Sequence, residues 1–533
     1  MLEKKSRKID WTVVIILIFT FILGVYQLGV RELEIDEYFS LHISQHPISD
    51  ILMLNNNYGY WYMNNLPPFY EFFLNLWARI FGSSVLAYRF PSVIFNVIFI
   101  LFVFKMGKLL VDREAGYLSA TLASFTLGFI FYSRFIRCYS LLNMLVTVSF
   151  YILFKMLKQN GFNKKNGIAL AVINIATIYT HYTGFLVLLF EALLIIVLRN
   201  DRKNKYRDIP YAAIIPLGCY MPWYKYFFIH IIKENTVQQI YYNSSYLQRL
   251  YVVLRDGVFG TNAILLIYAI LLLYFSGRYL LKNRLQKDDL FDKKALLAVL
   301  LVLIGSIVLV NLVNADTRSF RMKYFLAYLF PLFVISGYSV CNLPKRLGLA
   351  VFMILLILSG RQVCDFYENS VFRWPNTQLR KIISNIRPYE KKGLTIFIED
   401  NMYIPLFAYY YWNPGLAYKM STPRYGYKAN IFLEEIKSSV RIYGNVRGPL
   451  KIDGVVKGGG SDFAIWRWRE AIEAALERRW FLVLGTRGAK DFFDKTDEEI
   501  KKEENQNKIQ IKLAKEFRVV GYQGSLYEII LQR

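Results

Sequence analysis

Two adjacent carboxylates stand a few residues after the first long apolar run of the chain. They are Asp36 and Glu37, in the segment E-L-E-I-D-E-Y-F-S-L-H that follows the run over residues 11–30. A carboxylate at a membrane edge can take a proton from a hydroxyl group as that group attacks a reacting carbon, so both are candidate catalytic residues. The alternative is that they are ordinary interfacial acids that flank a helix.

Two turns rich in arginine and tyrosine are a second candidate site. The residues in question are Arg134, Arg137 and Tyr139 in Y-S-R-F-I-R-C-Y-S, and Arg318, Arg321 and Tyr324 in N-A-D-T-R-S-F-R-M-K-Y. A guanidinium group presents a planar fork of donors that suits a phosphate, so we predict that these residues bind the phosphate of an anionic lipid. The alternative is structural pairing of the arginines with acids such as Asp36 or Glu37.

Three histidines are candidate metal ligands or site residues. His42 and His46 stand four residues apart, which on a helix would place both on one face as metal ligands. Because the sequence has no H-E-x-x-H pattern, they are weak candidates, and we predict that no metal site and no cofactor is required. His181, in Y-T-H-Y-T-G, is expected at a helix end and is assigned to the secondary site.

The elements that position these residues are apolar segments long enough, or nearly so, to cross a bilayer. With 55% hydrophobic and only 20% charged residues, the chain is a polytopic α-helical membrane protein and not a string of soluble domains. We expect about eleven transmembrane helices. Their ranges are 11–30, 90–110, 115–132, 139–158, 168–180, 183–199, 209–228, 263–281, 295–313, 324–341 and 347–360.

The net charge of +25 reflects membrane orientation. In a soluble protein such a charge would suggest binding to nucleic acid, but here the basic residues lie in short loops between apolar runs. The positive-inside rule places those loops and the N-terminus in the cytoplasm. The acid pair and both arginine turns then lie on the outer face of the cell membrane, and no nucleic-acid partner is expected.

Two further segments complete the predicted organisation. The aromatic stretch F-Y-E-F-F-L-N-L-W-A-R-I-F-G, from residue 69, is too interrupted by polar residues to span and predicts an interfacial amphipathic helix. After residue 360 long apolar runs give way to alternating segments such as L-T-I-F-I-E and W-F-L-V-L-G. We therefore predict a transmembrane domain over residues 1–360 and an extracytoplasmic α/β domain over residues 361–533.

The order of these motifs resembles the dolichyl-phosphate-mannose protein mannosyltransferase superfamily. The motifs are the acid pair, N-L-P-P-F-Y with L-N-L-W-A-R-I-F-G, S-R-F-I-R-C-Y-S, T-H-Y-T-G and R-S-F-R-M-K-Y-F-L-A-Y-L-F-P, over roughly residues 10–340. That superfamily includes the aminoarabinose transferases that modify lipid A, and it has the GT-C fold. Family members often have a histidine before the proline pair, where this chain has Asn65 and Leu66, and Asn65 is therefore only a secondary site residue.

The resemblance implies an inverting glycosyltransferase that uses a polyprenyl-phosphate sugar donor. Asp36 matches the family's catalytic base, with Glu37 as its neighbour, and the arginine and tyrosine residues of the two turns match the lipid-phosphate site. The implied partners are the lipid-linked donor, membrane lipids, and a protein, lipid or glycan acceptor. This reaction does not require a nucleotide, nor does it necessarily require a divalent metal, for which the sequence gives no support.

Three other functions remain open on the sequence alone. A transporter or flippase for a lipid-linked sugar would also place arginines near a phosphate, but it should show inverted repeats, which we do not find in the sequence. A scaffold would use the C-terminal region to bind surface partners. The oligosaccharyltransferase branch of the same fold is disfavoured because its W-W-D-Y-G-type signature is missing from the C-terminal region.

Overall fold

The computed structural model describes the chain as two compact units. The first comprises Met1–Leu28, Ile43–Asn56 and Asn64–Ser370, and the second comprises Gly29–His42, Asn57–Met63 and Val371–Arg533. The structure describes residues 9–54, 67–159, 163–198, 207–228, 246–281, 290–313, 323, 326–368, 379–390, 394–398, 403–411, 441–444, 450–452, 455–457, 480–486, 509–519 and 522–531. The acidic segment after the first apolar helix therefore belongs to the same unit as the C-terminal residues.

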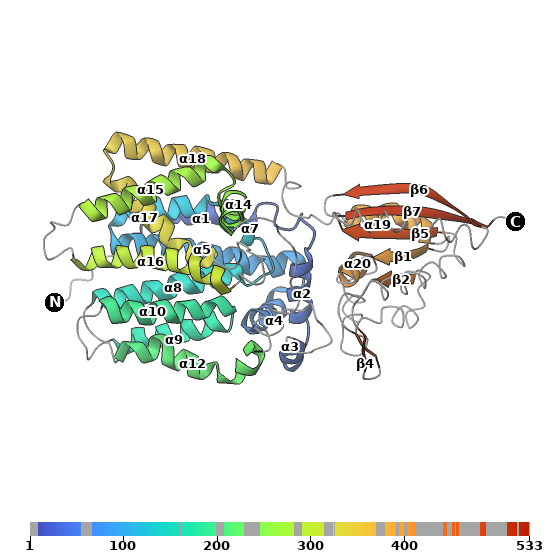
Figure 1. Cartoon of the computed structure of the whole chain (residues 1–533), viewed down its shortest axis with the longest axis horizontal. Coiled ribbons are helices and arrows are strands. Elements are labelled where there is room, and N and C mark those ends of the chain that lie inside the picture. The colour runs from blue at the N-terminus through green and yellow to red at the C-terminus, as the bar shows by residue number, and fades with distance from the viewer. Residues whose placement is uncertain are drawn as a thin grey trace. The chain divides into compact units, whose positions relative to one another are not determined.

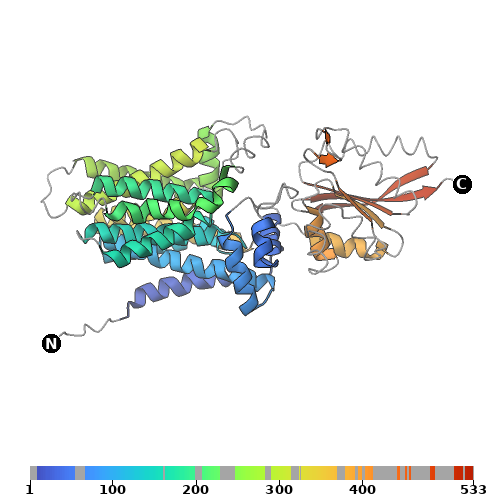
Figure 2. The ribbon, with the colours of Figure 1, turned by 90° about the horizontal axis from the view of Figure 1, so that it is seen from below.

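The first unit is a bundle of helices whose long members run side by side (Figures 1 and 2). Its helices up to residue 198 are α1 (Trp11–Val25), α3 (Ile48–Leu54), α4 (Phe69–Phe81), α5 (Val85–Leu110), α6 (Arg113–Ser124), α7 (Leu127–Tyr132), α8 (Tyr139–Lys158), α9 (Lys164–Ile178), η1 (Tyr182–Gly184) and α10 (Phe185–Leu198). The later ones are η2 (Pro210–Ile214), α12 (Ile215–Cys219), η3 (Met221–Trp223), α14 (Tyr246–Val252), η4 (Val253–Phe259), α15 (Asn262–Leu281), α16 (Leu290–Val313), η7 (Leu326–Tyr328), α17 (Phe330–Asn342) and α18 (Lys345–Glu368).

The predicted spans are mainly helical in the described residues, with several departures from their expected bounds. The span over 115–132 is two helices, α6 and α7, and the span over 209–228 is divided into short pieces, because prolines enter it at positions 210, 216 and 222. Helix α18 continues to residue 368, so the predicted domain boundary after residue 360 falls inside a helix. Within the described part, α5, α8 and α18 are long and apolar enough to cross a membrane.

Local capping explains where several helices begin. The Ser84 hydroxyl accepts a hydrogen bond from the Ala87 N–H at 3.1 Å at the start of α5, and the Asp112 carboxylate accepts one from the Ala115 N–H at 2.8 Å at the start of α6. The amphipathic helix predicted from residue 69 is α4, which ends at Gly82 with a positive φ of 88°. One face of α4 is buried and the other exposes Leu76 and Ile80.

Small residues let the central helices approach closely. A Cβ atom at Gly337 of α17 would lie 2.7 Å from the Ala115 carbonyl oxygen of α6, and one at Gly107 of α5 would lie 2.8 Å from the Cα atom of Gly116. Close approach through small residues is how apolar helices gain van der Waals contact where lipid supplies no hydrophobic drive. A larger residue at Gly107, Gly116 or Gly337 would therefore push α5, α6 and α17 apart.

A buried polar network joins α8, α9 and α10. The Asn174 amide nitrogen donates to Glu191 Oε2 at 2.6 Å and to the Ala212 carbonyl at 2.9 Å. The Ser149 hydroxyl lies 2.6 Å from Glu191 Oε1 and 2.5 Å from Asn174 Oδ1, yet it has only one proton to donate. Both short contacts form only if Glu191 carries a proton on Oε1 and donates it to Ser149, which then donates to Asn174.

The second unit contains a five-stranded sheet with strand order β2-β1-β5-β7-β6. Its strands are β1 (Leu394–Ile398), β2 (Arg441–Gly444), β5 (Trp480–Thr486), β6 (Ile509–Val519) and β7 (Tyr522–Leu531), and a separate hairpin pairs β3 (Leu450–Ile452) with β4 (Val455–Lys457). Strand β1 is parallel to β2 and β5, whereas β7 is antiparallel to β5 and β6. Helices α19 (Leu379–Glu390) and α20 (Tyr403–Tyr411) lie on one side of this sheet (Figure 2).

The predicted alternating segments are confirmed as strands: L-T-I-F-I is β1 and W-F-L-V-L-G lies in β5. The antiparallel register places Trp480 opposite Glu528 and Leu484 opposite Gly524. The sequence over residues 463–478 also predicts a helix, but these residues lie outside the described part of the chain. The remaining element, α2 (Ile35–Ser44), begins in this unit and ends in the first one.

We predict that Gly337→Ala destabilises the bundle by about 1–3 kcal/mol, since the new methyl group meets a backbone oxygen that cannot move alone. Thermal unfolding of the protein in detergent measures the effect. Gly277→Ala in α15 is the matched control, because a Cβ atom there has no neighbour within 4 Å. Equal stability of the two variants would contradict the close α6–α17 contact.

We predict that Glu191→Gln retains the stability of the wild type, because an amide N–H replaces the acid O–H toward Ser149. Glu191→Ala should lose about 1–3 kcal/mol, since it leaves buried polar partners unsatisfied. Infrared spectroscopy checks the proton directly, as the band of a protonated carboxyl group should disappear in Glu191→Gln. If Glu191→Gln is as unstable as Glu191→Ala, the assigned proton is wrong.

Candidate active site

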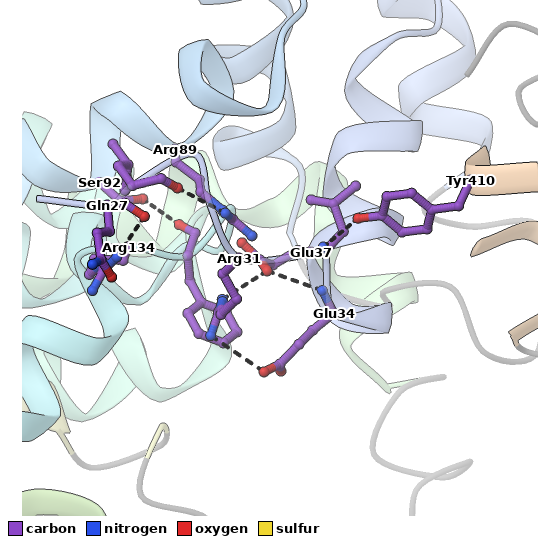
Figure 3. A network of polar contacts seen from close by, with 11 residues as sticks. Gln27, Arg31, Glu34, Glu37, Arg89, Ser92, Arg134 and Tyr410 are labelled. Carbon is purple, nitrogen blue, oxygen red and sulfur yellow. Dashed lines mark hydrogen bonds and ion pairs between the residues drawn. The ribbon is translucent and has the colours of Figure 1, made fainter. Parts of the chain in front are cut away.

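The acidic segment forms the first turn of α2, and Glu37 stabilises that turn. The Glu37 carboxylate is fully buried and lies 2.9 Å from Nη2 of Arg31, and it also accepts the backbone N–H of Glu34 at 3.1 Å. Glu34 precedes the helix, so Glu37 reaches back to it as in the carboxylate half of a capping box. Figure 3 shows Arg31 reaching both Glu37 and Glu34, the latter at 3.5 Å.

Asp36 differs from its neighbour in exposure. It occupies the second position of α2 and is partly exposed, whereas Glu37 is buried. The N-terminal turn of a helix presents backbone N–H groups that stabilise an anion. Of the two predicted catalytic carboxylates, Asp36 is therefore the more exposed one, and Glu37 has a structural role that its sequence position did not reveal.

In the first unit, two cations converge on the ring of Tyr139. The guanidinium carbon of Arg137 lies 5.8 Å from the ring centroid, and Nζ of Lys323 lies 5.6 Å from it. Arg137 and Tyr139 are buried, and Lys323 is partly exposed. The tertiary structure thus brings a residue of the late basic turn to the R-x-Y turn, although nearly two hundred positions separate them in the chain.

Glu71 of α4 belongs to the same cluster and was not predicted as a site residue. Glu71 and Tyr70 are both buried. Glu71 interacts electrostatically with Cys138, and Tyr70 interacts with Cys138 and Arg137. The pKa of the Cys138 thiol is raised to about 12, mainly by burial; Arg137 and Lys323 oppose the rise and Glu71 adds to it. Burial also raises the pKa of Tyr70 well above its usual value, so both groups keep their protons at neutral pH.

Arg134 is placed differently from Arg137. Its Nη2 donates to the carbonyl of Gln27 at 2.9 Å (Figure 3), and its guanidinium group lies over the rings of Tyr367 and Phe366, at 4.8 and 5.5 Å from the centroids. These contacts join the turn after α7 to α1 and α18. A second buried arginine, Arg89, donates to the Leu28 carbonyl at 2.9 Å and holds the chain just beyond α1.

His181 caps the short helix η1. Its Nδ1 accepts the backbone N–H of Thr183 at 3.1 Å and lies 2.9 Å from the Thr183 hydroxyl. A nitrogen that accepts a hydrogen bond is unprotonated, so the other ring nitrogen, Nε2, carries the proton in the neutral side chain. The His181 ring lies 6.2 Å from that of Tyr139, which places this helix-end residue beside the two cations.

The expectation that His42 and His46 share a helical face is wrong. Helix α2 ends at Ser44, and His46 lies in the bend that follows, because Pro47 disfavours helical backbone at the residue before it. The amide of Asn75 fixes this bend by donating to the carbonyls of Ser44 and His46, both at 2.8 Å. Among the described residues, no three histidine, cysteine or acidic side chains gather as metal ligands.

Four predicted site residues, Asn65, Arg318, Arg321 and Tyr324, lie outside the described residues. Sequence reasoning missed Arg31 and Glu71, and it placed Lys323 in the late basic turn without assigning it a phosphate-binding role. Arg31 and Lys323 had a signal, since both are basic residues on the predicted outer face, where the positive-inside rule disfavours them. Glu71 is an acid on the buried side of an otherwise apolar helix face, and the α4 sequence alone does not identify its partners.

Residues 65–226 match the family model of the dolichyl-phosphate-mannose-protein mannosyltransferases. The matched region contains Glu71, Arg137, Tyr139 and His181, and it begins after Asp36. The resemblance drawn from the motifs is thereby confirmed. No curated protein matches the sequence.

Two solved structures share the fold. ArnT from Cupriavidus metallidurans, in its apo state, aligns with a TM-score of 0.54 and 10% identity over 96% of this chain and 97% of that one. The oligosaccharyltransferase of Archaeoglobus fulgidus, in complex with Zn and sulfate, aligns with a TM-score of 0.51 and 14% identity over 89% of this chain and 67% of that one. The chain therefore has the GT-C fold of membrane glycosyltransferases, which agrees with its apolar helices.

The stability of this region should fall in mild acid because of His46. Burial lowers the pKa of His46 from 6.5 to about 4, against an opposing effect of Asp50. Between those two values the unfolded state binds a proton that the folded state does not, so stability is complete above about pH 6.5 and decreases as the pH falls toward 4.

Thermal unfolding of the wild type and of His46→Gln from pH 7.5 to 4.5 measures this contribution. The neutral variant should lose less stability over that interval than the wild type does. Parallel pH profiles for the two proteins would show that His46 does not carry the effect.

Proposed function

We propose that this protein transfers a sugar from a polyprenyl phosphate, dolichyl or undecaprenyl, to an acceptor hydroxyl at the outer face of the cell membrane. The observation that carries the proposal is the convergence of Arg137 and Lys323 on Tyr139. Two cations beside a buried phenol suit a phosphate that gains negative charge as its bond to the sugar breaks. The family match supports the same donor class, because its name specifies a dolichyl-phosphate sugar.

Asp36 is the proposed general base. Its carboxylate takes the proton of the acceptor hydroxyl while the hydroxyl oxygen forms a bond to the anomeric carbon and the bond from that carbon to the phosphate oxygen breaks. The electron pair of the broken bond leaves with the polyprenyl phosphate, which Arg137 and Lys323 stabilise. A single displacement inverts the anomeric configuration. A carboxylate near the reacting carbon also favours the oxocarbenium character of the transition state.

The other predicted site residues take supporting roles around the phosphate. Tyr139 supports the two cations, and Arg318, Arg321 and Tyr324, which lie outside the described residues, keep the phosphate-binding role predicted from the sequence. Arg134 has a bonding pattern that suits joining helices, so we place the phosphate on Arg137 in preference to it. The reaction needs neither nucleotide nor divalent metal, since the leaving group is already a phosphate and its charge is met by side chains.

Orientation, donor and acceptor complete the proposal. The N-terminus is cytoplasmic and the C-terminal domain extracytoplasmic, with a protein, lipid or glycan hydroxyl as acceptor. Hexosyl and pentosyl donors both fit the chemistry. The competing function is a transporter or flippase for the lipid-linked sugar, which would use the same cations to bind the phosphate but would not need a base.

We predict that Asp36→Asn lowers turnover at least about 100-fold while donor binding is kept, as expected for loss of a general base. The measurement is release of free polyprenyl phosphate from a panel of polyprenyl-phosphate sugars by the purified protein in lipid, with crude envelope as acceptor and with or without a chelator. Glu34→Gln is the matched control, because Glu34 stands at the same helix end and its 3.5 Å contact with Arg31 is weak.

Arg137→Gln should lower turnover about 100-fold or more by removing a phosphate donor, whereas Arg113→Gln, which removes an exposed pair with Asp10, should not. Unimpaired transfer by Asp36→Asn would exclude Asp36 as the base. Labelled lipid-sugar that crosses the bilayer without any release would identify the protein as a transporter. Loss of release on chelation would show that a metal takes part.

A further inference from the structure

The segment that precedes Asp36 is bound to the two helices of the C-terminal part of the second unit. The Glu32 carboxylate accepts the backbone N–H groups of Leu379 and Arg380, at 2.8 and 3.1 Å, which are the first two residues of α19. A carboxylate that spans two N–H groups at a helix N-terminus is favoured by both the hydrogen bonds and the helix dipole. Glu32 therefore caps a helix that lies 347 positions further along the chain.

The next residue is held by α20. The backbone N–H of Leu33 donates to the Tyr410 hydroxyl at 2.6 Å, and the Tyr38 ring meets the Tyr409 ring edge to face with centroids 5.9 Å apart. Leu33 is completely buried, so its N–H cannot turn to water if the phenol is removed. Burial raises the pKa of Tyr410, and its hydroxyl stays neutral at physiological pH.

The two helices are themselves fixed to each other. Nη2 of Arg387 in α19 donates to the Tyr411 carbonyl at the end of α20 at 2.8 Å, and the Arg380 guanidinium lies over the Tyr410 ring at 5.1 Å from its centroid. Apolar side chains of α19 and α20, among them Ile382, Ile386, Leu406 and Phe407, are fully buried. Glu32 and Tyr410 are thus anchored on one rigid pair of helices.

On the other side of the same segment, the Arg31–Glu37 pair and the Glu34 cap hold the first turn of α2. Residues 31–37 are consequently held through backbone groups at Leu33 and Glu34 and through side chains at Arg31, Glu32 and Glu37. Asp36 has little freedom to move relative to α19 and α20, because only three residues separate it from Glu32.

We propose that α19 and α20 of the C-terminal domain position the base, with Glu32 and Tyr410 as positioning residues for Asp36. This inference rests on the proposed function and gives the C-terminal domain a role in the reaction. Neither residue touches substrate in this scheme. A base displaced by about 1 Å can cost up to about 100-fold in rate, so loosening the segment should lower kcat and leave the donor KM unchanged.

Four variants in the full-length protein in lipid test the proposal. Tyr410→Phe removes only the hydroxyl that accepts from Leu33, and Glu32→Ala removes the cap of α19; each should lower kcat about 10- to 100-fold without changing the donor KM. Tyr409→Phe keeps the ring contact with Tyr38 and is the matched control, with wild-type kcat expected. Glu32→Gln keeps one acceptor oxygen and should recover part of the activity lost in Glu32→Ala.

Amide hydrogen exchange supplies a second readout that does not depend on turnover. The Leu33 amide should exchange faster in Tyr410→Phe, and the Leu379 and Arg380 amides faster in Glu32→Ala, with the sheet of the domain unchanged. The double variant Asp36→Asn with Tyr410→Phe should be no slower than Asp36→Asn alone, since a base that is missing cannot be misplaced.

The outcomes separate the two proposals. Faster exchange with unchanged kcat, or unchanged exchange with unchanged kcat, overturns the positioning role while Asp36 remains the base. A fall in kcat that is matched by Tyr409→Phe also overturns it, because the loss would then be a general effect on the domain. If Asp36→Asn is fully active but Tyr410→Phe is not, the base assignment of the proposed function has failed, and the positioning of Asp36 fails with it.

Discussion

The structure around the candidate base depends on one buried ion pair, between Arg31 and Glu37. A carboxylate taken fully out of water needs a cation and hydrogen-bond donors, and Glu37 has both: the Arg31 guanidinium and the Glu34 backbone N–H. The pair fixes the start of α2 immediately after the last polar contacts of α1. Asp36 is the preceding residue on that turn, so the pair contributes to its position together with the contacts of Glu32 and Leu33 to α19 and α20.

A similar requirement, that a charged group in an apolar bundle have hydrogen-bond partners, accounts for three other polar residues of the helical unit. Arg89 and Arg134 donate to the backbone carbonyls of Leu28 and Gln27, just beyond α1. Glu191 meets it in the opposite way, by keeping a proton and joining a network in which every described hydrogen bond has one donor and one acceptor. Polar residues in an apolar bundle are expensive, and these are retained where they tie helices together.

The cluster around Tyr139 is different because, among the described residues, it brings two cations and one acid together. Arg137 and Lys323 face one ring, and Glu71 acts on the same neighbourhood from α4. A group of residues with two cations and partial exposure at Lys323 suits an anionic ligand, whereas the charges of Arg31 and Glu37 compensate each other. We therefore propose that Arg137 and Lys323 bind the phosphate, and that Arg31 has a structural role.

The sequence by itself determined the class of the protein, because the length of apolar runs and the charge of the loops between them are local properties that decide insertion into a bilayer. It also determined the helix over 69–81, the strands at 394–398 and 480–486, and the candidate status of Asp36, Arg137 and Tyr139. Only the tertiary structure showed that Glu37 is buried against Arg31 while Asp36 stays partly exposed, since adjacent residues on a helix face different surroundings and residue type alone does not determine burial. It ended α2 before His46, brought Lys323 to Tyr139, and joined Glu32 to α19. Each of those depends on contacts between segments far apart in the chain, which no local pattern specifies.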